Sequence, residues 1–491
     1  MSMPSRPLPF HLDRDLGTPV YLQLYQRFRE AIEQGRLQPG ARVPSLRSLA
    51  SELNLARGTV EVAYQMLIAE GYLLARGPAG TCVSPRLTPT PRPALRASRP
   101  ARAESPHTAE ASPQPFQLGL PALDAFPRKL WARLAARHLR ELGGSALMVP
   151  DPAGHLALRE SLAGYLGISR GIHCRPEQVF ITAGHRASLA LVQRALMRPG
   201  EAIWLEDPGY PHARQLLEGL GMRGVPVPVD GEGLRVEDGL RLAPEARFAL
   251  VTPTHQSPTG VALSLPRRLA LLERARQMQG WVIEDDYDSE YRYQGRPLPA
   301  LKSLDREGRV LYAGTFSKVL YPGLRLAYLV VPDREVERFG EVAAQFGGGC
   351  SELLQATTAD FIDQGHFARH LKKMRSLYAR RRAHTCEALL AQCGEHLEID
   401  LQAGGMHLLA RLAPGSDDRT LADSAQAAGL AVAALSRWYL GEHGAPGLLL
   451  GFTNIATAEE ARALAGRLRD VLERDGQPGW PPGEGARPGD T

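Results

Sequence analysis

The sequence predicts an α/β protein in two parts, a winged helix-turn-helix at the N-terminus and a larger α/β domain with a mostly parallel sheet. Three short helical patterns and one hairpin pattern follow each other within the first 84 residues, which is the order of a winged helix-turn-helix. Beyond residue 116, apolar strand patterns alternate with helical ones. This alternation favours parallel strands joined by crossover helices.

Length and composition are those of a globular chain with more than one domain. At 491 residues, the chain exceeds what one hydrophobic core usually spans. Its apolar content of 44% and charged content of 23% are ordinary, and no uninterrupted apolar run approaches the roughly 20 residues of a membrane span. The first residues lack the apolar stretch of a secretory signal. We therefore expect a cytoplasmic protein without a membrane segment.

The cysteine pattern indicates neither a metal site nor disulfide bonds, and the net charge is only mildly basic. The five cysteines are widely scattered, and none belongs to a C-x-x-C pair, so neither a disulfide framework nor a zinc site is indicated. The net charge of +5 is mild for this length, and its distribution therefore matters more than its sum.

The first domain is expected at residues 17–84. Its apolar residues recur with helical spacing in three short runs, and Ser45 is placed as the N-cap of the second run. A Gly/Pro turn between two short apolar strands follows the third run and indicates a β-hairpin wing. The expected elements are helices at residues 21–32, 45–53 and 57–70 and a hairpin at residues 71–83.

Residues 39–50 and 56–60, together with the Gly71-Tyr72 pair, resemble the GntR-type DNA-binding domain over about residues 19–83. The resemblance implies a double-stranded DNA operator as partner, and a helix N-terminus suits contacts with base edges and phosphates. Ala56 stands where the family usually has serine, so a cap or a phosphate contact is expected to be missing. The DNA-binding residues that the resemblance implies are Ser45, Arg47, Arg57, Gly58, Thr59, Arg76, Gly77 and Gly80.

Two segments are expected to lack packed structure. Residues 85–115 carry many prolines and arginines without apolar periodicity, which is typical of a flexible linker. Residues 476–491 are rich in Gly and Pro and are expected to be a disordered tail. The second domain is therefore expected at residues 116–475.

Lys318 is the most informative residue of that domain. It lies on the connection between two apolar strand patterns, at residues 310–312 and 326–331, with hydroxyls and an arginine close by in sequence. A lysine amine forms a Schiff base with pyridoxal phosphate, and arginine offers a planar, permanently charged fork to a phosphate dianion. The residues placed to hold that phosphate are Thr315, Ser317 and Arg325.

Other strand ends carry groups that suit the same cofactor. A strand, a glycine turn and a helix start occur around Gly184, where the amides of Gly184, His185 and Arg186 are placed to receive phosphate. Tyr210 follows another strand, and its ring is placed to stack on a flat heteroaromatic ligand.

A third strand runs directly into carboxylates and a phenol at residues 280–291. A carboxylate against the pyridine nitrogen keeps it protonated, and a phenol two residues later can bond the 3-oxygen of the ring. We assign these roles to Asp285 and Tyr287, with Asp286 left as the alternative carboxylate. A metal site here would lack histidines at ligand spacing.

In this order, the motifs resemble fold-type I aminotransferases, which implies a large domain with a mostly parallel sheet and a small α+β C-terminal domain. Joined to a GntR-like head by a long linker, the chain resembles the MocR/GabR-type regulators. That resemblance implies pyridoxal phosphate on Lys318 and a head-to-tail homodimer. The segments that carry it are residues 119–121, 126–127, 131, 151–154, 158–159, 170–171, 252–260, 285–287, 318–325 and 365–378.

Two departures from the aminotransferase pattern bear on activity. Ser257 stands where the family usually has the asparagine whose amide bonds the 3-oxygen, so this cofactor contact is absent or replaced. Leu449 stands where many members have the arginine that binds the substrate α-carboxylate. Losing that charge-assisted fork removes about 1.5 to 3 kcal/mol per hydrogen bond. Full transamination is therefore less expected, although His212 or another arginine remains open as compensation.

Three hypotheses follow for the function. The first is a transcriptional regulator that senses pyridoxal phosphate itself, or an amine or amino acid joined to it. The second is an active aminotransferase that carries a DNA-binding head. The third is a dimerisation scaffold without cofactor, which Thr315, Ser317 and Arg325 make the least favoured.

Overall fold

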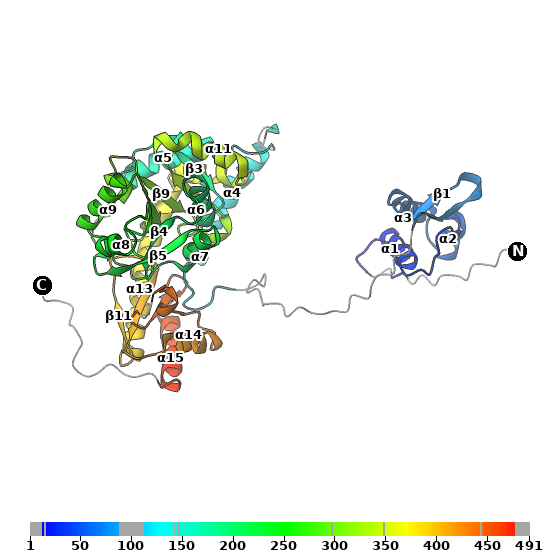
Figure 1. Cartoon of the computed structure of the whole chain (residues 1–491). Helices are drawn as coiled ribbons and strands as arrows, with labels where there is room; N and C mark the ends of the chain where they lie inside the picture. Colours follow the sequence, from blue (N-terminus) through cyan, green and yellow to red (C-terminus); the bar gives the residue numbers. More distant parts are fainter. Residues whose placement is uncertain are drawn as a thin grey trace. The chain divides into compact units, whose positions relative to one another are not determined.

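The computed structural model divides the chain into two compact units, residues 1–108 and 109–491 (Figure 1). The division falls inside the expected linker, most of which lies outside the described residues, as does the expected tail beyond residue 476. Within the described part, no helix is long and apolar enough to cross a membrane. The structure describes residues 12–13, 16–87, 112–141, 143–144, 148–295, 298–346, 349–441 and 444–476.

The first unit is a winged helix-turn-helix, as the sequence predicts. Ser45 caps the second helix by accepting a hydrogen bond from the Ser48 amide, whereas Ala56 offers the third helix no side-chain cap. Leu24, Phe28 and Leu67 are fully buried in a core shared by the helices and the wing. The elements are α1 (Val20–Glu33), α2 (Leu46–Glu52), α3 (Arg57–Ala69), β1 (Leu73–Ala75) and β2 (Thr81–Val83).

The second unit is built on an eight-stranded sheet with the strand order β3-β10-β9-β8-β7-β4-β5-β6. The strands from β9 to β5 in this order are parallel to one another. Strand β10 runs antiparallel to both of its neighbours, and β6 runs antiparallel to β5. The strands are β3 (Val179–Thr182), β4 (Ala202–Asp207), β5 (Arg223–Asp230), β6 (Gly233–Leu234), β7 (Phe248–Val251), β8 (Trp281–Asp286), β9 (Val310–Thr315) and β10 (Ala327–Val330).

Helices cover both faces of this sheet (Figure 1), which explains why its strands are apolar almost throughout. Helices α6, α7 and α11 pack on one face, against Ile203, Ile283 and Leu329. Helices α8 and α9 pack on the other face, against Trp204 and Val282, and α5 contributes to the core beside them. The helices are α4 (Arg128–Glu141), α5 (Leu156–Arg170), α6 (His185–Leu196), α7 (Pro211–Gly219), α8 (Val236–Leu242), α9 (Leu265–Gln277), α10 (Leu301–Leu304), α11 (Val336–Phe346) and α12 (Glu352–Asp363).

The C-terminal part is a smaller α+β unit, drawn in yellow to red in Figure 1. Its four strands are antiparallel, in the order β11-β12-β14-β13. This large α/β and small α+β arrangement confirms the fold class that the sequence predicts. The elements are α13 (His366–Cys393), β11 (Leu397–Asp400), β12 (His407–Leu412), α14 (Asp418–Ala427), β13 (Ala433–Ala434), β14 (Gly447–Gly451) and α15 (Ala458–Arg474).

The parallel strands bring their carboxyl ends to one edge of the large sheet. Strands β4, β7, β8 and β9 end there at Asp207, Val251, Asp286 and Thr315. In open α/β sheets, ligands bind beyond this edge. Most of the residues that the sequence singles out lie at or beyond these strand ends, and residues 184–186 follow β3.

Candidate cofactor site and nucleic-acid interface

Lys318 lies just beyond the end of β9, and its amine donates a 2.8 Å hydrogen bond to the Gly119 carbonyl. Its own carbonyl accepts a hydrogen bond from the Tyr291 hydroxyl at 3.2 Å, which holds the backbone in place. Burial lowers the pKa of the Lys318 amine, whereas Asp288 and Asp285 raise it. A lowered pKa increases the fraction of unprotonated amine, which is the form that attacks an aldehyde.

Gly119 is the residue that leaves room for this amine. Its φ of +76° is unfavourable for other residues, and an added Cβ would lie 2.6 Å from Lys318 Nζ. We expect Gly119→Ala to weaken pyridoxal phosphate binding about tenfold, because the displaced amine loses about 1.4 kcal/mol of interactions. Titrating the visible absorption of the full-length protein with the cofactor measures this.

Gly200→Ala is the matched control for this substitution. Gly200 also has a positive φ, +89°, but an added Cβ would meet nothing within 4 Å. This variant therefore shares the backbone strain without touching Lys318. Equal loss of cofactor affinity in both variants would contradict a specific role for Gly119.

Arg325 and the start of α6 form a cationic cradle at the same edge. The Arg325 guanidinium donates to the Ala183 carbonyl at 2.8 Å. At Gly184, where φ is +102°, an added Cβ would lie 3.0 Å from Arg325 Nη2. A cation this close to a helix N-terminus is unfavourable unless an anion binds between them. The arrangement therefore fits a phosphate.

Thr315, Ser317 and the backbone amide of Arg186 are the other groups assigned to the phosphate. Thr315 Oγ1 accepts a hydrogen bond from the Ser317 amide at 3.1 Å, which turns the chain after β9. Both side chains are half-buried, whereas the Arg186 side chain is exposed, so Arg186 contributes to the cradle through its amide position only.

Asp285 and Asp286 point to opposite faces of the sheet, because neighbouring residues of a strand alternate. Asp286 is ion-paired with Arg170 at 2.7 Å and accepts a 2.6 Å hydrogen bond from Tyr312. Asp285 instead lies on the α6 face, 3.3 Å from His185 Nε2. Burial raises the pKa of Asp285, while His185 lowers it. Of the two carboxylates, Asp285 is therefore the one that faces the site.

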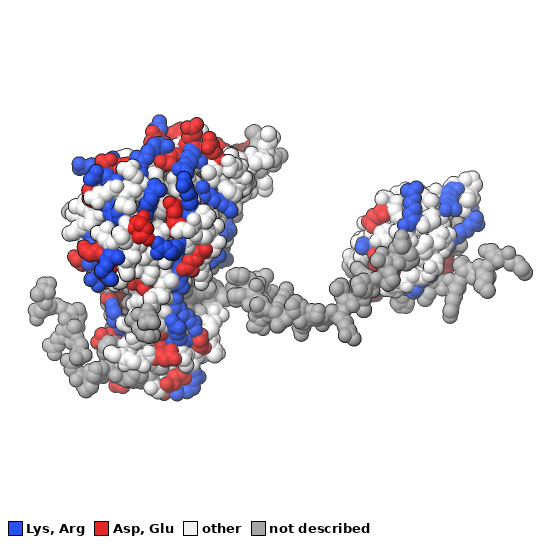
Figure 2. Space-filling view, viewed as in Figure 1, with Lys and Arg blue, Asp and Glu red and all other residues white. Residues whose placement is uncertain are grey.

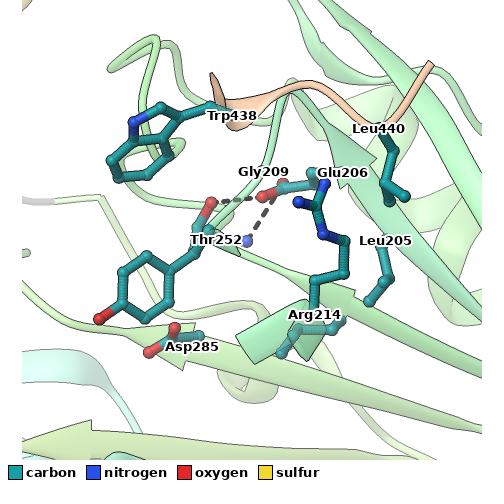
Figure 3. Close-up of a pocket in the computed structure, with 10 residues that line it drawn as sticks. Leu205, Glu206, Gly209, Arg214, Thr252, Asp285, Trp438 and Leu440 are labelled. Atoms are coloured by element: carbon teal, nitrogen blue, oxygen red, sulfur yellow. Dashed lines mark hydrogen bonds between the residues drawn. The ribbon is translucent and has the colours of Figure 1, made fainter. Parts of the chain in front are cut away.

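Figure 3 shows Asp285 in a pocket that Trp438 and Thr252 also line, with Asp285 below both of them in this view. Tyr210 lines this pocket, with its ring 5.9 Å from the Trp438 ring and 6.4 Å from that of His185. Glu206 is buried here and accepts hydrogen bonds from the Thr252 hydroxyl and amide at 2.5 and 3.1 Å. Burial raises the pKa of Glu206 to about 7. The pocket thus joins aromatic walls to a polar floor, which suits a flat heteroaromatic ring.

Tyr287 follows Asp285 by two residues, and its hydroxyl lies near Ser257. Burial raises the pKa of Tyr287 well above its ordinary value, and a hydrogen bond from Ser257 opposes this shift. The Tyr287 hydroxyl also lies 2.9 Å from His255 Nδ1. His255 and its neighbour Asp288 were not predicted from the sequence. Their positions directly after β7 and β8 were the available signal.

Leu449 is fully buried in β14, in an apolar cluster with Leu409 and Leu435. Leu118 and Trp438 pack against this cluster. The position where many aminotransferases have a carboxylate-binding arginine is therefore filled by hydrocarbon. His212 is exposed and lies edge-on to Tyr210, with ring centroids 5.4 Å apart.

The expected DNA-binding residues lie on the surface of the first unit. All of them are exposed except Thr59, which is half-buried. Figure 2 shows Lys and Arg side chains along the upper edge of this unit, with acidic residues mostly elsewhere on the visible face. Arg47, Arg57 and Arg76 form no ion pair with any described residue. Unpaired arginines at helix N-termini and in a wing suit contact with phosphates.

Two family models match the chain. Residues 20–83 match bacterial regulatory proteins of the gntR family, and residues 122–443 match aminotransferase class I and II. The probable rhizopine catabolism regulatory protein MocR of Rhizobium meliloti is 39% identical over 459 residues, which cover 90% of this chain and 92% of the relative. The chain belongs to the MocR-type family of GntR regulators. It is thus a transcriptional regulator with a DNA-binding head and an aminotransferase-like domain.

Other relatives agree with this MocR-type assignment. The pyridoxine biosynthesis transcriptional regulator PdxR of Corynebacterium glutamicum is 32% identical, over 91% of this chain and 94% of the relative. Among solved structures, LysN, an α-aminoadipate aminotransferase from Thermus thermophilus complexed with N-(5'-phosphopyridoxyl)-L-leucine, is 30% identical with a TM-score of 0.66. The match covers 73% of this chain and 92% of that one. The aminotransferase class I and II fold is that of pyridoxal-phosphate-dependent proteins.

Proposed function

We propose that this MocR-type regulator binds pyridoxal phosphate through Lys318 and that occupancy of this site changes how the head binds its operator. One observation carries the proposal. A half-buried lysine, a buried carboxylate and an arginine-helix cradle converge at one sheet edge in a chain that also has a DNA-binding head. When bound, the cofactor supplies an aldehyde that links reversibly to amines.

Each part of the cofactor would be contacted by a different set of the assigned residues. Thr315, Ser317, Arg325 and the amides at the start of α6 would hold the phosphate. Tyr210 would stack on the ring, Asp285 would hold the pyridine nitrogen protonated, and Tyr287 would bond the 3-oxygen with Ser257 beside it. The buried Nε2 of His185 has no hydrogen-bond partner among the described residues, which is compatible with a polar ligand at this place.

The effector is proposed to be pyridoxal phosphate itself or an amine that joins it. The apolar surroundings of Leu449 disfavour the α-carboxylate of a common amino acid, because a buried carboxylate needs a charged or hydrogen-bonding partner. PdxR is named as a regulator of pyridoxine biosynthesis, which supports the cofactor as effector. MocR is named as a probable regulator of rhizopine catabolism, which supports a catabolic ligand.

A working aminotransferase is the alternative. It is favoured by the site of Lys318 and Asp285 and by the 30% identity to LysN. It requires repeated turnover of an amino-acid and keto-acid pair, which the hydrocarbon around Leu449 opposes. Measuring keto-acid release over many turnovers distinguishes it from sensing.

We also propose that the protein is a homodimer, in which each head contacts the aminotransferase-like domain of the partner copy. Met148 and Val149 are 72% and 86% exposed, and apolar side chains this exposed are usual at interfaces. A cytoplasmic location fits a protein that binds an operator. Sedimentation of the full-length protein measures the mass in solution.

Operator binding with and without cofactor tests the main proposal. The DNA is a fragment that the full-length protein itself selects from a random-sequence library. We expect pyridoxal phosphate to change the dissociation constant at least about fivefold or to alter the footprint, as for typical allosteric coupling. Identical affinity and footprint, measured with protein that is coloured by the cofactor, would contradict the proposal.

A further inference from the structure

His255 and Asp288 form a buried pair behind the Tyr287 phenol. His255 Nδ1 lies 2.9 Å from the Tyr287 hydroxyl and 3.1 Å from Asp288 Oδ2. All three groups are buried or nearly so, and Asp288 is only 2% exposed. One ring nitrogen therefore faces both a phenol and a carboxylate.

The geometry at Nδ1 distinguishes these two neighbours. The contact to Tyr287 is aligned as a hydrogen bond, whereas Asp288 Oδ2 is buried without a hydrogen-bond partner among the described residues. The carboxylate therefore acts on Nδ1 through its charge. A negative charge 3.1 Å away favours the imidazole tautomer that carries its proton on Nδ1.

That tautomer decides the direction of the hydrogen bond to the phenol. With a proton on Nδ1, His255 donates to the Tyr287 oxygen, and the phenolic proton is free to be donated elsewhere. With the proton on Nε2, Nδ1 would accept a hydrogen bond from the phenol. The phenolic proton could then not be donated to the cofactor. Ser257 also hydrogen-bonds to this phenol, and its short side chain stands where aminotransferases usually have an amide. Without that amide, Tyr287 becomes the more important hydrogen-bond donor to the 3-oxygen of the cofactor.

We propose that Asp288 and His255 are positioning residues that direct the Tyr287 proton toward the 3-oxygen of the cofactor. This inference rests on the proposed cofactor site. The other titratable groups around it are His407, whose ring centroid is 5.9 Å from that of His255, together with Lys318, Asp285, Glu206 and Tyr293. His407 is engaged elsewhere, with Nε2 2.9 Å from the Pro258 carbonyl.

The readout is the pH titration of the visible band of the cofactor bound to the full-length protein. A donor to the 3-oxygen stabilises its negative charge in the unprotonated chromophore and so lowers the apparent pKa of the chromophore. In Asp288→Asn, His255 is no longer held in the tautomer that frees the Tyr287 proton. The 3-oxygen then loses its donor, which raises the pKa of the chromophore. The same substitution also removes a negative charge near the chromophore, which lowers it directly.

A double-mutant cycle separates the two effects. In a His255→Leu background, Asp288→Asn retains only the direct charge effect. We therefore expect the pKa shift caused by Asp288→Asn to be about one unit more positive with His255 present than without it, since one hydrogen bond contributes about 1.4 kcal/mol. In a Tyr287→Phe background, the difference should vanish as well.

His407→Leu is the matched control, because it removes a neighbouring half-buried histidine whose hydrogen bond goes to the Pro258 carbonyl and not to Tyr287. The Asp288→Asn shift should be unchanged in that background, and circular dichroism of every variant checks that it is folded. Equal shifts with and without His255, in folded and coloured proteins, would overturn this inference alone. A wild-type protein that stays colourless with pyridoxal phosphate would overturn the cofactor site and this inference together.

Discussion

Lys318→Ala is expected to leave the full-length protein without a visible absorption band at saturating pyridoxal phosphate. The amine of Lys318 is the group at the end of β9 that can bond covalently to the aldehyde, and alanine cannot replace it. Operator binding of this variant should no longer respond to the cofactor. Absorption spectra and mobility-shift titrations with and without the cofactor measure both effects.

Lys302 provides the matched control for this substitution. Its amine is also buried and donates to the Val310 carbonyl at 2.7 Å, and burial lowers its pKa. It lies beyond the amino end of β9, at the opposite edge of the sheet from Lys318. Lys302→Ala should therefore keep the visible band although it destabilises the fold. A coloured Lys318→Ala protein would contradict the assigned role.

Asp286→Ala is expected to lower the free energy of unfolding of the second unit by about 3 to 5 kcal/mol. The substitution leaves the Arg170 guanidinium buried without its carboxylate and removes the acceptor of the Tyr312 hydroxyl. Burial alone would lower the pKa of Arg170, but Asp286 helps to hold it well above its ordinary value. The variant loses this support, but a guanidinium keeps its proton in proteins even so, and Arg170 therefore stays charged. Urea denaturation followed by circular dichroism measures the change.

The control for Asp286→Ala is an equally short but exposed pair. Arg437 and Asp423 lie 2.6 Å apart with side chains 47% and 66% exposed. Water screens such a pair, so Asp423→Ala should cost less than about 1 kcal/mol. A similar loss in both variants would mean that burial of the Arg170–Asp286 pair does not determine its contribution.

Most of the fold could be predicted from local patterns. The three helices and the wing of the head agree with the prediction within about two residues, because caps, glycines and helical periodicity mark their ends locally. The strand before Lys318 and the strand that carries Asp285 also agree with the prediction. Residues next to these strand ends share one edge of a parallel sheet, so the candidate site could be assembled from sequence alone.

Other features required the three-dimensional packing. Asp285 and Asp286 are adjacent in sequence, and β8 is apolar on both faces, so its pattern does not reveal which face carries the site. The packing of α6 and α7 on the Ile283 side decides this. His255 and Asp288 were missed because the two residues are 33 positions apart in sequence and follow different strands.

By itself, the sequence determined the two-part architecture, the lysine at the end of β9 and the loss of the carboxylate-binding arginine at Leu449. These properties depend on residue type and local periodicity, which can be read along the chain. Only the tertiary structure decided that Asp285 faces the pocket, that Asp286 belongs to the core and that His255 contacts Tyr287. Those outcomes depend on which helices cover each face of the sheet and on which strand ends become neighbours, and both are set by long-range packing.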